Sequence, residues 1–373
     1  MNRDAPSIDA PYPRLRPFEP HEAAIFFGRG SHTIAMLQLL EKQNFLAVVG
    51  SSGCGKSSLV RAGLLPAVAE GYLNGETDWR FVIVRPGEVL GSGVDTFGNL
   101  AAQLVATLQP ELAQSELALE TRAYREATLR MGPNGLLDAI HDSLAHDDST
   151  HVFVLVDQFE EIFRYRDDSL SRDQQRQQQN DAVAFVDLLL STAQARDPRV
   201  FVSLTMRSDF LGDCDAFHGL PQAINVSQFL PPRLTRDELR DVIELPLQVE
   251  PFHGAINPHI TAELLNAVSD SQDLLPLLQH VLRHMWTMAA PHGEPDVQTP
   301  HHITLDHFKD IGGLSQALDR HANDLYHSLT SEQQRVAERL FRCLAEQSAQ
   351  GQLTRRLTSV REVTTSPASA RTR

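Results

Sequence analysis

Short runs of apolar residues alternate along the first part of the chain with longer stretches in which apolar positions recur every three to four residues. Four runs have the length and the β-branched or aromatic content of buried strands. They lie at 45–49, 80–85, 152–156 and 200–206. Between them, helical periodicity predicts helices at 96–108, 136–144 and 182–193. Strands that alternate with helices predict a parallel α/β sheet with helices on both faces.

The pattern changes beyond residue 234, where the chain becomes mainly helical. Helical spacing of apolar residues predicts helices at 236–245, 261–268, 273–286, 312–325 and 331–344. The tract DQQRQQQN at 173–180 is low in complexity and is typical of a solvated loop. Residues 1–10 and 364–373 have no apolar period, and we expect both to be disordered tails.

Composition narrows the classes of function. The chain has 373 residues, a formal net charge of −15 and no Lys/Arg run, so a broad surface for nucleic acid is not expected. Its three cysteines are too scattered for a disulfide framework, and its sixteen histidines lack the spacing of a zinc site. The N-terminus has no apolar leader, and no segment approaches the ~18 apolar residues of a membrane span. These features predict a cytoplasmic protein with neither a membrane nor a nucleic-acid partner.

The most specific motif directly follows the first predicted strand. It reads Gly50-Ser51-Ser52-Gly53-Cys54-Gly55-Lys56-Ser57, which matches G-x-x-x-x-G-K-[ST], and a helical pattern begins at Ser58. In such a loop, backbone N–H groups converge on the β-phosphate, the lysine reaches the β- and γ-phosphates, and the serine hydroxyl ligates Mg²⁺. The chain has thirty arginines and only three lysines, so a lysine at position 56 is itself informative. We predict that residues 50–58 bind ATP or ADP with Mg²⁺.

A metal-binding carboxylate is expected at the carboxyl end of a neighbouring strand. The run at 152–156 ends at Asp157, which we predict to hold Mg²⁺ together with Ser57. Glu160 and Glu161 follow, and either one can orient the attacking water, with Glu161 preferred. The alternative is that these acids only stabilise the N-terminus of a solvated helix.

The strand at 200–206 ends at Arg207. An arginine at the tip of a strand beside the phosphate loop can reach the γ-phosphate and sense whether it is present. The alternative is an ordinary surface arginine that pairs with Asp209 or Asp213. We favour the sensing role for Arg207.

Several motifs, in this order, resemble the bacterial novel STAND NTPase domain, whose members are signal-transduction ATPases related to the NACHT and apoptotic ATPases within the AAA+ group. The similar segments, within about residues 11–345, are PYPRLRPF, FFGR, FLAVVGSSGCGKSSLVRAGLLP, VFVLVDQFEEIF, RSDFL and DLLPLLQHVLRHMW. The resemblance implies an ASCE-type P-loop domain at 11–234, a helical domain at 235–327 and a partial winged-helix-like region at 328–363. It also implies that Gly28 and Arg29 line the adenine side of the site and that Pro276 packs near the nucleotide.

The chain departs from the family pattern in two ways. Gly30 and Ser31 follow the Gly-Arg pair, where the family has an acid, and the sequence ends at Arg373 without a complete winged helix or sensor repeats. The resemblance implies a slowly hydrolysing nucleotide switch that is read by a protein partner or by self-association. The alternatives are a P-loop ATPase or kinase that turns over a separate substrate, and a nucleotide-binding remnant of a truncated gene.

Overall fold

The computed structural model describes residues 8–87, 89–90, 93–145, 147, 149–166, 171–268, 274–289, 301–347 and 353–355. The chain forms two compact units, Met1–Thr304 and Leu305–Arg373. The tails predicted at 1–10 and 364–373 lie outside the described residues, apart from residues 8–10, of which Ala10 is buried.

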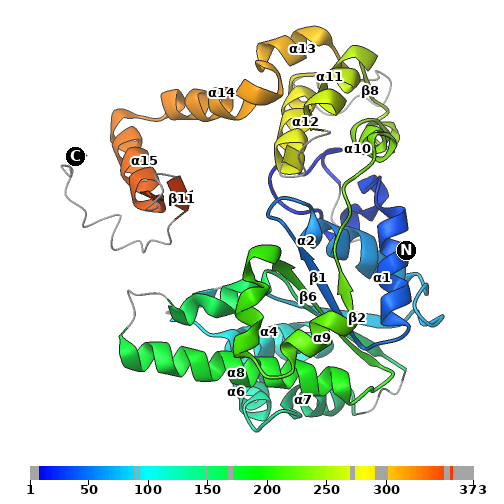
Figure 1. Ribbon diagram of the computed structural model, residues 1–373, viewed down its shortest axis with the longest axis vertical. Coiled ribbons are helices and arrows are strands. Elements are labelled where there is room, and N and C mark those ends of the chain that lie inside the picture. The colour runs from blue at the N-terminus through cyan, green and yellow to red at the C-terminus, as the bar shows by residue number, and fades with distance from the viewer. Residues whose placement is uncertain are drawn as a thin grey trace. The chain divides into compact units, whose positions relative to one another are not determined.

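The first unit is built on a five-stranded parallel sheet (Figure 1). In spatial order, its strands are β2 (Trp79–Val84), β5 (His151–Val156), β6 (Val200–Arg207), β1 (Phe45–Gly50) and β7 (Gln228–Phe229). Four of them confirm the strands predicted from apolar runs. The fifth, β7, has two residues and is too short to produce such a run.

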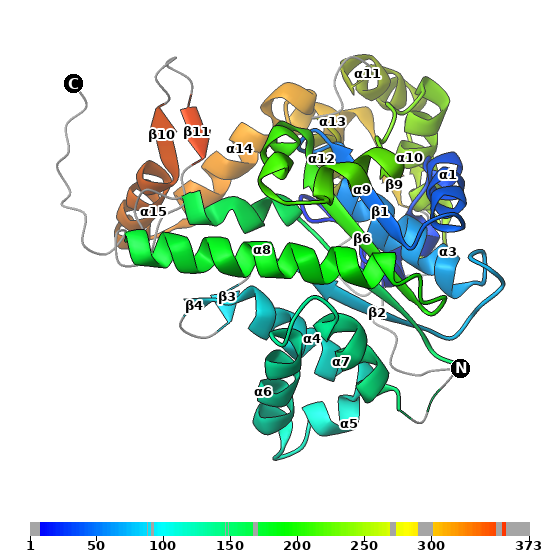
Figure 2. The same cartoon turned by 60° about the horizontal axis from the view of Figure 1, so that its bottom comes forward.

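Helices cover both faces of this sheet (Figure 2). In β1, Phe45, Ala47 and Val49 belong to the core on one face, and Leu46 and Val48 belong to the core on the other. The first core includes residues of α4 (Thr96–Leu108), α6 (Ala118–Leu129), α7 (Gly135–Ser143), α8 (Arg172–Gln194) and α9 (Leu220–Val226). The second includes residues of α1 (Gly30–Leu40), the π-helical turn η2 (Leu59–Leu64) and α3 (Leu65–Ala69). Because both faces are buried, the strands are apolar at nearly every position.

The start of α8 corrects one sequence prediction. The tract at 173–180, which we expected to be a solvated loop, forms the first turns of this helix. The Ser171 hydroxyl accepts a hydrogen bond from the Gln174 N–H, and the Gln174 side chain accepts one from the Ser171 N–H. This capping box starts the helix, and glutamine is a good helix former. The polar tract is therefore a solvated helix surface.

The remaining elements are mainly helical. The first unit continues with α10 (Arg236–Gln248), β8 (Ala255–Ile256), α11 (Pro258–Val268), α12 (Leu275–Ala289) and β9 (His302–Ile303). The second unit contains α13 (Leu305–Asp310), α14 (Gly313–Ser328), α15 (Ser331–Leu344) and the antiparallel pair β10 (Ala345–Gln347) and β11 (Leu353–Arg355). These helices confirm the predicted ones, whereas residues 348–352 and 356–363 of the predicted winged-helix-like region lie outside the described residues.

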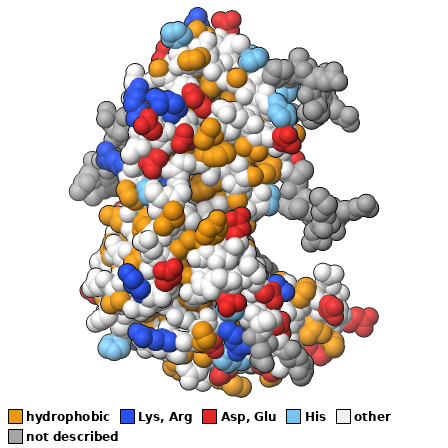
Figure 3. Space-filling view, turned by 90° about the vertical axis from the view of Figure 1, so that its right-hand side faces the viewer, with side chains coloured by type: hydrophobic (Ala, Val, Ile, Leu, Met, Phe, Trp, Pro, Cys, Tyr) orange, Lys and Arg blue, Asp and Glu red, His pale blue; other side chains and the backbone are white. Residues whose placement is uncertain are grey.

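Charged side chains are mixed on the surface. On the face shown in Figure 3, Lys and Arg side chains form small groups among acidic and apolar ones. Among the helices that the structure describes, none is long and apolar enough to cross a membrane.

Candidate functional site

The phosphate loop connects β1 to the short helix α2 (Lys56–Ser58). Gly53 and Gly55 have φ angles of 78° and 92°, in the left-handed region that favours glycine. A Cβ on Gly50 would lie 2.9 Å from the Sγ of Cys54. The positive φ angles of Gly53 and Gly55 and the close contact at Gly50 therefore favour glycine at all three positions.

Lys56 is buried and holds its ammonium group against this loop. Its Nζ donates hydrogen bonds to the carbonyl oxygens of Gly50, at 2.9 Å, and Ser51, at 2.7 Å. A phosphate oxygen carries negative charge and is a stronger acceptor than either carbonyl. The cation is thus in place for the predicted contact with the β- and γ-phosphates.

Asp157 follows β5 and has no exposed surface. Its Oδ1 accepts hydrogen bonds of 2.7 Å from the hydroxyls of Ser57 and Thr205. Its Oδ2 accepts from the guanidinium groups of Arg61, at 2.9 Å, and Arg85, at 3.4 Å. Burial by itself would raise the pKa of Asp157, but the hydrogen bonds and the two arginine charges outweigh it and lower the pKa. The carboxylate is therefore ionised and contacts the Ser57 hydroxyl.

The position of Asp157 in the sheet corrects a detail of the sequence prediction. We expected its strand to neighbour that of the phosphate loop, but β6 lies between β1 and β5. Thr205, on β6, donates its hydroxyl to the same carboxylate oxygen as Ser57. The intervening strand therefore contributes directly to the site.

Glu160 and Glu161 lie in the 3-10 helix η3 (Phe159–Arg166). Oε2 of Glu160 accepts a 3.3 Å hydrogen bond from the backbone N–H of Arg207. Burial raises the pKa of Glu160, and backbone hydrogen bonds together with the charges of Lys56 and Arg207 offset only part of this effect. A carboxylate with a raised pKa suits a proton acceptor. This geometry supports Glu160, while the preference for Glu161 stays a prediction.

Arg207 lies at the end of β6, which is adjacent to β1 as predicted. Its guanidinium forms an ion pair with Asp209, the contact expected for the alternative surface role, and lies 5.7 Å from the centre of the Phe210 ring. The Arg207 side chain is 42 % exposed, and such pairs contribute about 1 kcal/mol or less. Moving the guanidinium from Asp209 to a phosphate would therefore cost little.

Gly28 and Arg29 lie where the phosphate loop approaches α10. The φ angle of Gly28 is 77°, and a Cβ at this position would lie 2.6 Å from the carbonyl oxygen of Glu238 in α10. The buried Arg29 donates hydrogen bonds to the carbonyl oxygens of Cys54, at 3.0 Å, and Pro232, at 2.8 Å. Burial lowers the pKa of Arg29, and the charge of Glu238 offsets part of this effect. The pair thus connects the loop to α10, while its role toward adenine stays a prediction.

Helix α12 carries the remaining predicted residue and two histidines. Pro276 lies in its first turn, where no helical hydrogen bond is lost, and its place near a nucleotide stays a prediction.

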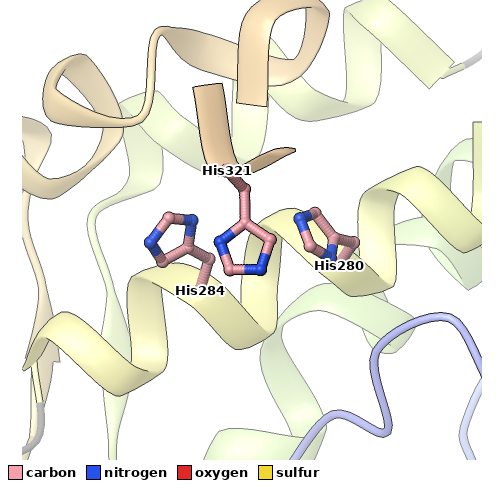
Figure 4. A group of neighbouring side chains, drawn as sticks. All are labelled: His280, His284 and His321. Carbon is pink, nitrogen blue, oxygen red and sulfur yellow. The ribbon is translucent and has the colours of Figure 1, made fainter. Parts of the chain in front are cut away.

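His280 and His284 lie one turn apart on this helix, and their ring centres are 6.3 Å apart (Figure 4). The four-residue spacing places both imidazoles on the same face of the helix.

Sequence reasoning missed four residues around Asp157, namely Thr205, Arg85, Arg61 and Glu19. The first three carried a signal, because Thr205 is polar within a buried strand, Arg85 directly follows a strand, and Arg61 interrupts an apolar helix. Glu19 carried none, because it reaches the site only through Arg61, which is 42 positions away in the sequence.

The family described as Novel STAND NTPase 1 matches residues 11–373. No curated protein matches the chain. Similar solved structures include a Walker-type ATPase of Pyrococcus abyssi, with 12% identity, a TM-score of 0.47, and coverage of 88% of this chain and 80% of that chain. They also include the ORC2 protein of Aeropyrum pernix in ADPNP–ADP complexes, with 13% identity, a TM-score of 0.46, and coverage of 84% and 73%. The likeness to these structures concerns the fold alone.

Proposed function

The chain belongs to the novel STAND NTPase 1 family, and we propose that it is an ATP-binding signalling ATPase in which slow hydrolysis resets a conformational switch. The observation that carries this proposal is the arrangement of Lys56, Ser57 and Asp157. The phosphate loop holds a buried lysine, and its serine hydroxyl contacts an ionised carboxylate that follows another strand. One site therefore has groups for both the phosphates and Mg²⁺.

Ser57 and Asp157 are the residues that would hold Mg²⁺. Both offer oxygen atoms, these atoms lie 2.7 Å apart, and the lowered pKa keeps Asp157 ionised, which suits a hard divalent cation. When bound, Mg²⁺ supplies positive charge to the β- and γ-phosphate oxygens. Lys56 supplies a second positive charge from the loop.

We assign the hydrolytic step to the acids that follow Asp157. Glu160 or Glu161 orients the attacking water and accepts its proton, and the raised pKa of Glu160 supports this role. Arg207 exchanges Asp209 for the γ-phosphate and so distinguishes ATP from ADP. Its position on β6, adjacent to β1, supports this assignment.

The switch transmits the difference between ATP and ADP to the helices that follow the sheet. Arg29 donates hydrogen bonds both to the phosphate loop and to the segment that leads into α10. A shift of the loop would therefore displace the start of that helix. Reversing a two-state equilibrium from 1:99 to 99:1 takes about 5.5 kcal/mol of differential affinity. Contacts of the γ-phosphate with Lys56, Mg²⁺ and Arg207 are the source of this difference. A protein partner or a second copy of the chain reads the outcome.

The test is ATP turnover by the purified protein, with the bound nucleotide identified after denaturation. We expect the wild type to carry ADP and to turn over slowly, and Lys56→Ala to carry no nucleotide. Glu160→Gln and Glu161→Gln separate the two candidate acids, because the variant that lacks the working acid should retain ATP. The exposed Glu41→Gln is the matched control and should behave as the wild type. A wild type that binds no nucleotide, or that turns over near the ~10 s⁻¹ common among enzymes, contradicts the proposal.

A further inference from the structure

Arg61 joins the metal carboxylate to the N-terminal segment. It lies in η2 and is 7% exposed. Its Nη2 donates to Oδ2 of Asp157 at 2.9 Å, and its Nη1 lies 2.9 and 3.0 Å from the two carboxylate oxygens of Glu19. One buried guanidinium thus lies between two carboxylates, of which Asp157 is fully buried and Glu19 is partly exposed.

The segment that carries Glu19 is itself held against the site. The backbone N–H of Phe18 donates a 3.2 Å hydrogen bond to the hydroxyl of Ser58, in the helix that follows the phosphate loop. Earlier in the same segment, the fully buried Tyr12 donates its hydroxyl to the carbonyl oxygen of Ile243 in α10. The segment therefore contacts both the phosphate-loop helix and α10.

We propose that Glu19 and Arg61 are positioning residues that set how much Mg²⁺ strengthens nucleotide binding. This inference rests on the proposed function, because it concerns the same Mg²⁺ site. The charges alternate along this set of contacts, because the negative Glu19 contacts the positive Arg61, which in turn contacts the negative Asp157. Asp157 is the member of the set that would hold Mg²⁺. Arg61 reduces the negative potential that the metal meets at Asp157. Glu19 cancels part of the charge of Arg61 and so restores some of that potential.

This alternation of charge predicts effects of opposite sign. Removing the charge of Glu19 leaves Arg61 less compensated and weakens the contribution of Mg²⁺. Removing the charge of Arg61 leaves Asp157 more negative and strengthens it. Even with a dielectric constant as high as that of water, ~80, we expect changes of at least about threefold for Glu19→Gln and at least about tenfold for Arg61→Met. An ion pair that only stabilises the fold would leave the Mg²⁺ contribution unchanged or weaken it in both variants.

The experiment measures the dissociation constant of the non-hydrolysable ATP analogue AMPPNP in EDTA and in saturating MgCl₂. The readout is the ratio of the two constants, which cancels damage common to both conditions. Arg61→Lys keeps the charge and should remain close to the wild type. Glu41→Gln changes the net charge by the same amount at an exposed position of the first unit and should leave the ratio unchanged.

A smaller ratio in Glu19→Gln and a larger one in Arg61→Met support the inference. If Arg61→Met does not fold, Glu19→Gln, Glu19→Lys and Arg61→Lys still decide it, because Glu19→Lys should reduce the ratio further than Glu19→Gln. Shifts of equal sign in Glu19→Gln and Arg61→Met, or no shift while AMPPNP still binds, overturn the inference and leave the proposed function standing. A wild type that does not bind AMPPNP in either buffer overturns the proposed function and this inference with it.

Discussion

Gly28→Ala tests the contact between the loop before α1 and helix α10 with a single methyl group. The added Cβ would lie 2.6 Å from the carbonyl oxygen of Glu238 and 2.9 Å from a methyl group of Val242. Alanine at a φ of 77° costs about 1 kcal/mol, and forcing a methyl group into a packed contact costs about 1–3 kcal/mol more. We therefore expect the free energy of unfolding to fall by about 2–4 kcal/mol.

Two other glycines separate these contributions. Gly75 has a φ of 80°, but no atom in the described part of the chain lies within 4 Å of the position that its Cβ would take, so Gly75→Ala should cost only the conformational ~1 kcal/mol. Gly30, the first residue of α1, has neither a positive φ nor such a neighbour among the residues described. Gly30→Ala should be neutral or should stabilise the protein by up to about 1 kcal/mol.

The assay is urea unfolding of the three variants and the wild type, followed by circular dichroism, with AMPPNP binding measured on the same samples. The difference between Gly28→Ala and Gly75→Ala isolates the clash with α10. Surface substitutions usually change the free energy of unfolding by no more than about 0.5 kcal/mol. If the losses in the two variants agree within about this amount, the packing of Gly28 against α10 is refuted.

Three further predictions follow from buried groups. Asp157→Asn leaves the charge of Arg61 without its buried carboxylate and should cost about 3 kcal/mol at pH 7. Because the native pKa of Asp157 is lowered, this difference from the wild type should be present above about pH 4 and be lost as the pH falls through the native value, as urea unfolding between pH 7 and pH 3 can show. Tyr12→Phe removes the hydroxyl that donates to Ile243 and should lower the free energy of unfolding by about 1–2 kcal/mol, which thermal unfolding measures. Burial raises the pKa of Cys214 to about 12, so iodoacetamide at pH 8 should not label it before the protein unfolds, and rapid labelling detected by peptide mass spectrometry would contradict this.

The strands and the phosphate loop could be predicted because their signals are local. A strand buried on both faces must be apolar throughout, and the loop needs glycine at Gly53 and Gly55 because their φ angles are positive. Local signals also mislead when only composition is considered. The tract at 173–180 is polar, but Ser171 and Gln174 form the capping box that makes it a helix.

The rest of the site depends on contacts that no local pattern encodes. The order of parallel strands is not fixed by their order in the chain, so the sequence could not place β6 between β1 and β5. Arg61 lies 96 positions from Asp157, and Tyr12 lies 231 positions from Ile243. An arginine among thirty does not indicate which carboxylate it contacts until the fold brings the two together.

The balance of charge at the site explains why nucleotide and metal should act together. The site has three positive charges, on Lys56, Arg61 and Arg85. Both arginines contact the carboxylate of Asp157, and Arg61 also contacts that of Glu19. The positive charges of Lys56, Arg61 and Arg85 favour a polyanion such as a nucleotide and oppose a divalent cation that arrives alone. In the proposed function, the phosphates of the nucleotide add several negative charges to the site. In this proposal, the nucleotide creates the Mg²⁺ affinity, and the arginine between the two carboxylates determines how far that affinity rises.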